Sequence, residues 1–261
     1  MLHFLFPSDP LDPKEADDIF GEQADAMRTR GFGVSLFSLE ELQMGNFKIR
    51  GAIPQGATVV YRGWMMDEGE YGKLVDMIHS RGAIPLTSLS SYLNCHHLPN
   101  WYPLISEFTA ETRIFSADAD LSSELSALGW GKFFVKDYVK SLKTSVGSII
   151  SKPEEIAALL AEMQKFRGTI EGGICVRRFE SFREQSERRY FVILGVPYAP
   201  SNDVPNLVAE CAHRISSPFF SVDVAIHNDG TERVVEIGDG QVSDIVGWNV
   251  SEFANLWTTK D

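Results

Sequence analysis

Two acidic residues on neighbouring predicted strands are the first candidates for chemistry. Residues 219–227 and 232–237 alternate apolar and polar side chains, and the Asp229-Gly230 pair between them is typical of a two-residue hairpin loop. In that register Asp223 lies directly opposite Glu236, on the face away from the valines. Like charges so opposed destabilise a hairpin unless a cation neutralises them, and an all-oxygen site favours Mg²⁺ or Mn²⁺. Asp239, just beyond the second strand, is a candidate third oxygen ligand.

Basic residues that could meet phosphate groups lie earlier in the chain. Lys136 is at the end of a predicted apolar strand, residues 132–137. Lys140 and Lys143 follow in a segment rich in small hydroxyl residues, which suits a loop that covers phosphates. The G-x-x-x-x-G-K-[ST] pattern is absent, so this is not a Walker motif.

Arginines concentrate on two further predicted strands, residues 173–180 and 187–194. Their guanidinium groups can form forked, charge-assisted contacts with phosphate or carboxylate oxygens. Glu187 and Arg189 share one face of the second strand, and Arg188 lies on the other. We favour a functional role for Arg189 and expect Arg188 to be solvated.

Each of these charged groups also has a structural interpretation. The carboxylates fit the exposed acidic face of an edge hairpin, and a lysine cluster is usually a solvated surface. The arginines fit surface ion pairs, which would involve Arg183, Glu184, Glu187 and Arg188.

The elements that must position these residues change character along the chain. Predicted strands at 2–6, 33–37, 58–62 and 83–86 alternate with predicted helices at 14–30 and 70–80. This indicates an α/β domain, residues 1–110, with a mainly parallel sheet. We interpret residues 87–112 as a linker. Beyond it, a strong helix at 153–167 and the strands named above predict an α+β domain, residues 111–261, with antiparallel sheets.

Bulk composition narrows the partners and the compartment. The formal net charge of −12 argues against binding to a nucleic-acid backbone, although it allows a local basic pocket for one nucleotide. Apolar runs are too short for a membrane-spanning helix. Three widely spaced cysteines, Cys95, Cys175 and Cys211, indicate reduced, packed thiols, and we therefore expect a cytoplasmic protein.

The order of these segments resembles the ATP-grasp superfamily, and most of all its compact clade named for two arginines and a lysine. The resemblance rests on the lysine strand, the hydroxyl-rich loop, the helix, the Val-Arg-Arg-Phe and Glu-Arg-Arg-Tyr-Phe-Val strands, the Asp hairpin and Glu-Ile-Gly-Asp-Gly. It covers about residues 111–245, and the preceding α/β domain corresponds to the pre-grasp domain of that family. Residues 59–65 also look like the clade.

The resemblance implies ATP held with Mg²⁺ between two lobes. Lys136 would contact the phosphates with help from Lys143, and residues 175–180 would form the hinge beside adenine. The other implied roles are backbone contacts of Arg178 and Phe179 to adenine, Glu187 at the ribose, Arg189 at the transferred phosphoryl group, and Asp223 and Glu236 as metal ligands. The family motif usually ends in Glu-x-Asn, whereas Gly238 stands at the third position here. Asp239 is the expected substitute.

The implied chemistry is ligation, in which ATP phosphorylates a carboxylate and an amine or related nucleophile then displaces phosphate. The acceptor is a small molecule, a peptide or a protein terminus, and Arg62 and Arg113 are its candidate contacts. One alternative is a nucleotidyltransferase that forms a lysyl-AMP, although the Lys-x-Asp-Gly pattern is absent. The other is a nucleotide-binding interaction module with a degenerate grasp site, consistent with Gly238 and a loop whose only glycine is Gly147.

Overall fold

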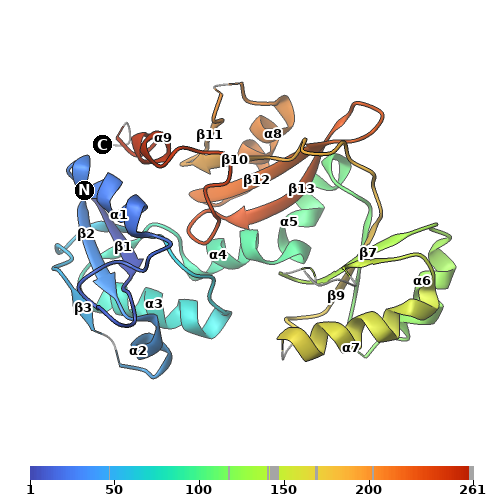
Figure 1. The fold of residues 1–261 in the computed structure, drawn as a ribbon, viewed down its shortest axis with the longest axis horizontal. Coiled ribbons are helices and arrows are strands. Elements are labelled where there is room, and N and C mark those ends of the chain that lie inside the picture. Colours follow the sequence, from blue (N-terminus) through green and yellow to red (C-terminus); the bar gives the residue numbers. More distant parts are fainter. Residues whose placement is uncertain are drawn as a thin grey trace. The chain divides into compact units, whose positions relative to one another are not determined.

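Two units make up the computed structural model of the chain, and each combines segments that are separate in the sequence (Figure 1). Unit 1 comprises residues 1–93, 188–222 and 238–261, and unit 2 comprises residues 94–187 and 223–237. The structure describes residues 1–46, 48–116, 118–139, 141, 147–167, 170–201 and 203–258.

Unit 1 is built on a five-stranded sheet in the order β3-β2-β1-β4-β5. Strand β1 pairs in parallel with β2 and β4, and β4 pairs in parallel with β5, whereas the short β3 is antiparallel to β2. The predicted mainly parallel sheet is therefore confirmed. Its strands are β1 (Leu2–Pro7), β2 (Gly33–Phe37), β3 (Ile49–Arg50), β4 (Thr58–Tyr61) and β5 (Ile84–Pro85).

Alternation along β1 gives this sheet two apolar faces. Phe4 and Phe6 pack into one core, which also contains residues of α1 (Gly21–Thr29) and α9 (Val250–Asn255). Leu5 packs into the opposite core, and α2 (Leu39–Gln43), α3 (Glu68–Ser80) and α4 (Leu89–His96) supply residues to it. Because both faces are covered, the strands are almost entirely apolar, as expected for a parallel sheet.

Unit 2 contains a four-stranded antiparallel sheet in the order β6-β9-β7-β8. One of its faces, including Phe133, Val135 and Val176, packs against the apolar sides of α6 (Leu121–Leu128) and α7 (Ile156–Arg167). A 3₁₀ turn, η2 (Pro153–Glu155), precedes α7, and the strands are β6 (Thr112–Phe115), β7 (Phe133–Asp137), β8 (Ile149–Ile150) and β9 (Ile174–Arg178).

A third sheet has the strand order β11-β10-β12-β13, and β10 and β11 are antiparallel. Its four strands are β10 (Arg188–Ile193), β11 (Val196–Tyr198), β12 (Phe219–Ile226) and β13 (Glu232–Asp239). Helix α8 (Asn206–Arg214) lies between β11 and β12 in the chain. The antiparallel sheets expected in the second part of the chain are therefore present.

Two local predictions are wrong. The predicted linker contains α4, α5 (Leu98–Ile105) and the 3₁₀ turn η1 (Ser106–Phe108). Pro99 lies in the first turn of α5, where a helix loses no hydrogen bond to proline. The helix predicted for residues 14–30 forms only over α1, because the Asp12 and Asp17 carboxylates accept hydrogen bonds from nearby backbone N–H groups and favour turns.

No described helix is long and apolar enough to span a membrane. The three cysteines are buried and form no disulfide bond, which agrees with the expectation of packed thiols.

Helix α3 begins with a capping box in which the Asp67 carboxylate accepts from the Glu70 N–H at 2.8 Å and Glu70 reciprocates. We expect Asp67→Ala to lower the free energy of unfolding by about 0.5–2 kcal/mol, since an N-terminal N–H loses its partner. Urea denaturation measures this change. Asp76→Ala, on the exposed face of the same helix, is the matched control and should leave the midpoint nearly unchanged.

Candidate functional site

Lys136 lies on the second face of the unit 2 sheet. In the register of β7 and β9, Lys136 pairs with Cys175 and Phe134 pairs with Arg177. These side chains therefore share the face opposite Val135 and Val176, which belong to the apolar core. Although it carries a charged amine, Lys136 is only 4% exposed.

The partner of this lysine is the carboxylate of Glu236 on β13, with Nζ and Oε1 2.5 Å apart. The Glu236 side chain is 41% exposed, whereas that of Lys136 is 5% exposed, so the pair has one buried and one accessible member. The residue predicted to bind phosphate thus contacts a residue predicted to bind metal.

Arg177 is a buried charge on the same face that the sequence patterns above do not single out. Its Nη1 donates to the Val235 carbonyl at 2.6 Å and its Nη2 to Thr109 Oγ1 at 2.5 Å. Burial lowers the pKa of this guanidinium, and Glu236 acts against that change. The apolar alternation of Ile174 and Val176 already directs residue 177 to the lysine face, and that signal could have identified it.

Arg178, the last residue of β9, is exposed. Its backbone N–H donates to the Glu111 carbonyl at 2.7 Å. The N–H of Phe179 donates to the Lys132 carbonyl at 3.2 Å, and the Lys132 amine lies 5.4 Å from the Phe179 ring centroid. The backbone N–H groups of Arg178 and Phe179 are therefore already used. Hinge contacts to adenine stay a prediction.

The hairpin that carries Asp223 and Glu236 is present, but its loop is one residue longer than predicted. The His227 N–H donates to the Thr231 carbonyl, which places these two residues opposite each other and leaves three residues in the loop. At the far end the Gly240 N–H donates to the Phe219 carbonyl, as in the predicted register. One strand must hold an extra residue between these points, which is the definition of a β-bulge. Asp223 is buried within β12.

Gly238 cannot be exchanged for the asparagine of the family motif without movement. A Cβ at this position would lie 2.9 Å from Ser243 Oγ and 3.0 Å from Ser221 Oγ. Those two hydroxyls also hydrogen-bond to each other at 2.8 Å. The serines therefore occupy the space next to the Gly238 backbone, and residue 238 itself offers no side-chain ligand.

Asp239 is a completely buried carboxylate in unit 1. Its Oδ1 accepts from the backbone and side-chain N–H groups of Gln241 at 3.0 and 3.1 Å. Its Oδ2 has no hydrogen-bond partner within the described part of the chain. Burial raises the pKa of Asp239 to about 7, because the charged form loses its hydration. The second oxygen is chemically suited to a cation, and its metal role stays a prediction.

The remaining predicted site residues lie in different settings. Arg62 is fully buried, and its guanidinium donates to Gln23 Oε1 and to the carbonyls of Gly240 and Ser243. Arg189 donates to the Asp244 carbonyl at 3.0 Å.

The other predicted site residues are exposed or lie outside the described residues. Arg113 is exposed and pairs with Glu111 at 2.8 Å, and Glu187 is also exposed. Lys143 lies outside the described residues, as does Lys140. All their predicted roles stay predictions.

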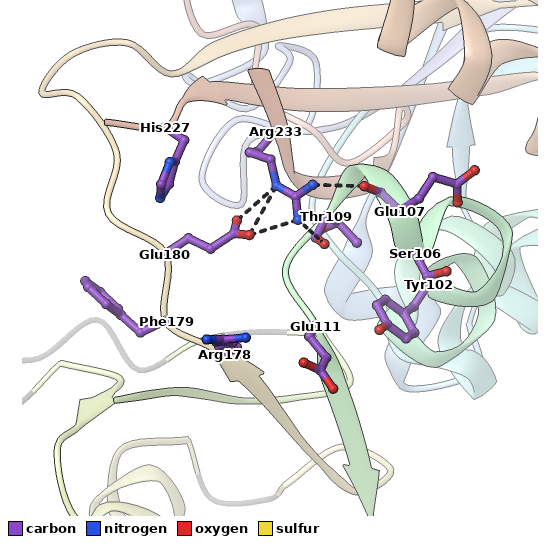
Figure 2. Close-up of a pocket in the computed structure, with 10 residues that line it drawn as sticks. All are labelled: Tyr102, Ser106, Glu107, Thr109, Glu111, Arg178, Phe179, Glu180, His227 and Arg233. Carbon is purple, nitrogen blue, oxygen red and sulfur yellow. Dashed lines mark hydrogen bonds and ion pairs between the residues drawn. The ribbon is translucent and has the colours of Figure 1, made fainter. Parts of the chain in front are cut away.

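A pocket of about 610 Å³ opens in unit 2 beside the end of β9 (Figure 2). Arg233 lines this pocket and contacts Glu180, with distances of 2.8 and 3.1 Å to Oε1. The same guanidinium donates to the carbonyls of Glu107 and Thr109. Arg233 thus connects β13, the segment after β9 and the end of η1. The lining residues are Tyr102, Ser106, Glu107, Thr109, Glu111, Arg178, Phe179, Glu180, His227 and Arg233.

Across the described residues, no group of three or more His, Cys, Asp or Glu side chains is arranged to hold a metal ion. Within unit 2, Asp223 and Glu236 nevertheless supply the oxygen donors that Mg²⁺ prefers. Since Mg²⁺ commonly uses one or two carboxylates together with substrate phosphates, this donor set fits a nucleotide-bound cation.

Comparison with known proteins identifies the class to which this fold and site belong. A family model for the ATP-grasp domain, family 3 of the clade named for two arginines and a lysine, matches residues 127–259, just over half of the chain. The chain therefore belongs to this family, and the resemblance seen in the sequence is confirmed. No curated protein is significantly similar in sequence.

Solved structures of ATP-grasp ligases share the fold over nearly the full length. The D-cycloserine synthetase DcsG matches with a TM-score of 0.65 and 13% identity, covering 99% of both chains. The D-alanine-D-alanine ligase from Coxiella burnetii matches with a TM-score of 0.63 and 13% identity, covering 94% of this chain and 88% of that one. The ATP-grasp ligase PsnB, in complex with Mg, ADP and a precursor variant, matches with a TM-score of 0.60 and 12% identity, covering 98% and 97%. The predicted fold class is therefore confirmed.

The Arg233–Glu180 contact should matter for stability, since both side chains are largely buried and Arg233 has four acceptor contacts. We expect Arg233→Ala to lower the free energy of unfolding by about 1.5–3 kcal/mol, because Glu180 and two carbonyls lose a charged donor. Guanidinium chloride titration measures this. Arg183→Ala removes an exposed arginine nearby and should cost far less. Equal losses in the two variants would contradict the contact's importance.

Asp239 should make stability depend on pH. The folded protein keeps this carboxyl protonated up to about pH 7, because burial raises its pKa, whereas the unfolded chain ionises it near the ordinary value of 3.8. The folded state therefore binds more protons in this range, and its contribution to stability falls as pH rises from about 4 to 7. We expect a smaller loss of stability between pH 5 and 8 in Asp239→Asn than in the wild type. Urea midpoints at both pH values test this, with Asp76→Asn as the control.

Proposed function

We propose that this protein is an ATP-dependent, ADP-forming ligase that joins a carboxylate to an amine or related nucleophile. The observation that carries the proposal is the contact between Lys136 and Glu236 in a member of the ATP-grasp family. A buried lysine beside an accessible carboxylate is the combination needed for a phosphate chain with its metal ion. The PsnB structures that contain Mg and ADP support the choice of ligands.

Each residue of the proposed site has a distinct task. Lys136 binds phosphate oxygens and stabilises the charge that develops on the transferred phosphoryl group. Asp223 and Glu236 hold Mg²⁺, which when bound screens the phosphate charges. Asp239 is the proposed third oxygen donor. The other proposed contacts are Lys143 and Arg189 with phosphate, Glu187 with the ribose, and the backbone at Arg178 and Phe179 with adenine.

The proposed reaction has two steps. A carboxylate oxygen of the substrate attacks the γ-phosphorus of ATP, so that the bond to ADP breaks and an acylphosphate forms. The amine nitrogen then attacks the acyl carbon, inorganic phosphate leaves, and the nitrogen loses a proton. The protein supplies position and electrostatic stabilisation rather than a nucleophile of its own.

The acceptor belongs to one of the classes handled by proteins of this fold. A D-alanine-D-alanine ligase joins small molecules, whereas PsnB has been solved with a precursor peptide. We propose a small molecule, a peptide or a protein terminus as the acceptor, with Arg113 as an exposed candidate contact. Arg62 is the other proposed contact, but its hydrogen bonds hold the interior of unit 1 together.

One observation favours a second function, a nucleotide-binding module without turnover. Gly238 and its two serine neighbours leave no side chain at the position where the family motif usually has asparagine. Such a module would bind nucleotide without releasing phosphate. A lysyl-AMP mechanism would require the Lys136 amine to leave Glu236, which it contacts at 2.5 Å, before it could attack the nucleotide. Mass spectrometry after incubation with ATP would detect the covalent AMP of that mechanism.

We expect Lys136→Ala and Glu236→Ala each to reduce ATP turnover at least about 100-fold, since each removes a charge that the transition state requires. ADP release in the presence of amino-acid, peptide and protein acceptors is the measurement. Circular dichroism verifies the fold, and Lys165→Ala, which removes an exposed lysine from α7, is the matched control. The ligase proposal is contradicted if both variants turn over ATP at the wild-type rate with an acceptor that the wild-type protein uses.

A further inference from the structure

The Lys136–Glu236 pair joins two residues whose proposed roles require them to be apart. Lys136 must turn to phosphate oxygens, and Glu236 must turn to a cation, yet the two side chains here contact each other at 2.5 Å. Both residues belong to unit 2, so the contact is internal to one unit.

The two members of the pair are not equally able to move. Lys136 extends from a strand that is hydrogen-bonded on both sides, and its side chain is 5% exposed. Glu236 is 41% exposed and can rotate towards solvent. The backbone of β13 is itself held, because Arg177 donates to the carbonyl of Val235, the residue before Glu236. Opening the pair is therefore a side-chain rotation of Glu236 and does not require β13 to separate from β9.

We infer that the Lys136–Glu236 ion pair acts as a latch that makes nucleotide binding and divalent-cation binding depend on each other. The inference rests on the proposed function, since it takes Lys136 as the phosphate contact and Glu236 as a metal ligand. It adds the energetic coupling between the two ligands and names the residues that create it.

The coupling follows from charge compensation. A nucleotide without a cation can replace Glu236 as the partner of Lys136, but it leaves the displaced carboxylate beside phosphate oxygens of the same sign. A cation without nucleotide can satisfy Glu236, but it leaves a buried lysine with no counter-charge beside a dication. Leaving the buried Lys136 amine without a counter-charge is unfavourable. Only the two ligands together give both Lys136 and Glu236 a new partner.

The first arm of the test measures binding of the non-hydrolysable analogue AMPPNP by calorimetry, in EDTA and in excess Mg²⁺. For the wild type we expect at least about tenfold tighter binding in Mg²⁺, within the usual range of coupling between two sites. Glu236→Gln releases Lys136 and removes the repelling charge, so it should bind AMPPNP in EDTA about three- to tenfold more tightly than the wild type. Glu232→Gln makes the same charge change at an exposed position of the same strand and should behave as the wild type.

The second arm tests the reciprocal effect with Mn²⁺ as the probe, followed by the electron paramagnetic resonance signal of the free ion. Without nucleotide, Lys136→Gln should bind Mn²⁺ more tightly than the wild type, because Glu236 has lost its competitor. Lys132→Gln is the charge-matched control from an exposed position. Neither arm depends on turnover.

The outcomes separate the latch from the proposed function. If the wild type binds AMPPNP with Mg²⁺ but Glu236→Gln gains no more affinity in EDTA than Glu232→Gln, the latch is overturned and the nucleotide site stands. The same holds if Lys136→Gln gains no Mn²⁺ affinity over Lys132→Gln. If the wild type binds AMPPNP in neither condition, the proposed function fails, and the latch fails with it. Tighter metal-free binding by Glu236→Gln together with tighter Mn²⁺ binding by Lys136→Gln establishes the latch.

Discussion

The physical constraint on which the site depends is the burial of positive charge on one face of a β-sheet. In unit 2, the strands β7 and β9 bury valine and isoleucine against two helices, and the same alternation places Lys136 and Arg177 on the other face. A buried cation is tolerated only with a counter-charge or hydrogen-bond acceptors. Glu236 supplies the charge for the lysine, and the carbonyl of Val235 supplies an acceptor for the arginine. Successive residues of β13 thus compensate both cations.

Compensation by Glu236 and by backbone oxygens has different consequences. The bonds of Arg177 to a carbonyl and a threonine hydroxyl have no charged partner that a ligand could displace, so this residue is suited to holding β13 in place. The Lys136 contact is an ion pair with an accessible carboxylate, and in the proposed site a phosphate and a cation would replace it. A fixed contact beside an exchangeable one is what a binding site needs, since the scaffold keeps its shape while the ligand contacts form. Arg233 provides a similar fixed contact at the end of β9.

The chain shares its fold with ATP-grasp ligases although few of its side chains are the same. The likeness to DcsG and to a D-alanine-D-alanine ligase extends over nearly the whole chain at 13% identity. At that identity most side chains differ, and the fold is retained through alternating apolar residues and helix packing. In unit 1, the hydroxyls of Ser221 and Ser243 fill the space beside Gly238. The nearby Asp239 is buried with one oxygen satisfied, and its raised pKa reflects the cost of burying that charge.

The sequence by itself determined the features that depend on local periodicity. Alternating residues predicted the strands of both parts of the chain and the hairpin that bears Asp223 and Glu236, and an apolar run placed Lys136 on a strand. Tertiary structure decided which charges meet, because the partner of a buried side chain is set by packing between distant segments. Lys136 and Glu236 are 100 positions apart in the chain, and no local pattern could pair them. For the same reason, only the folded chain showed that Arg177 is buried, that Arg62 is committed to the interior of unit 1, and that a proline-containing segment forms α5.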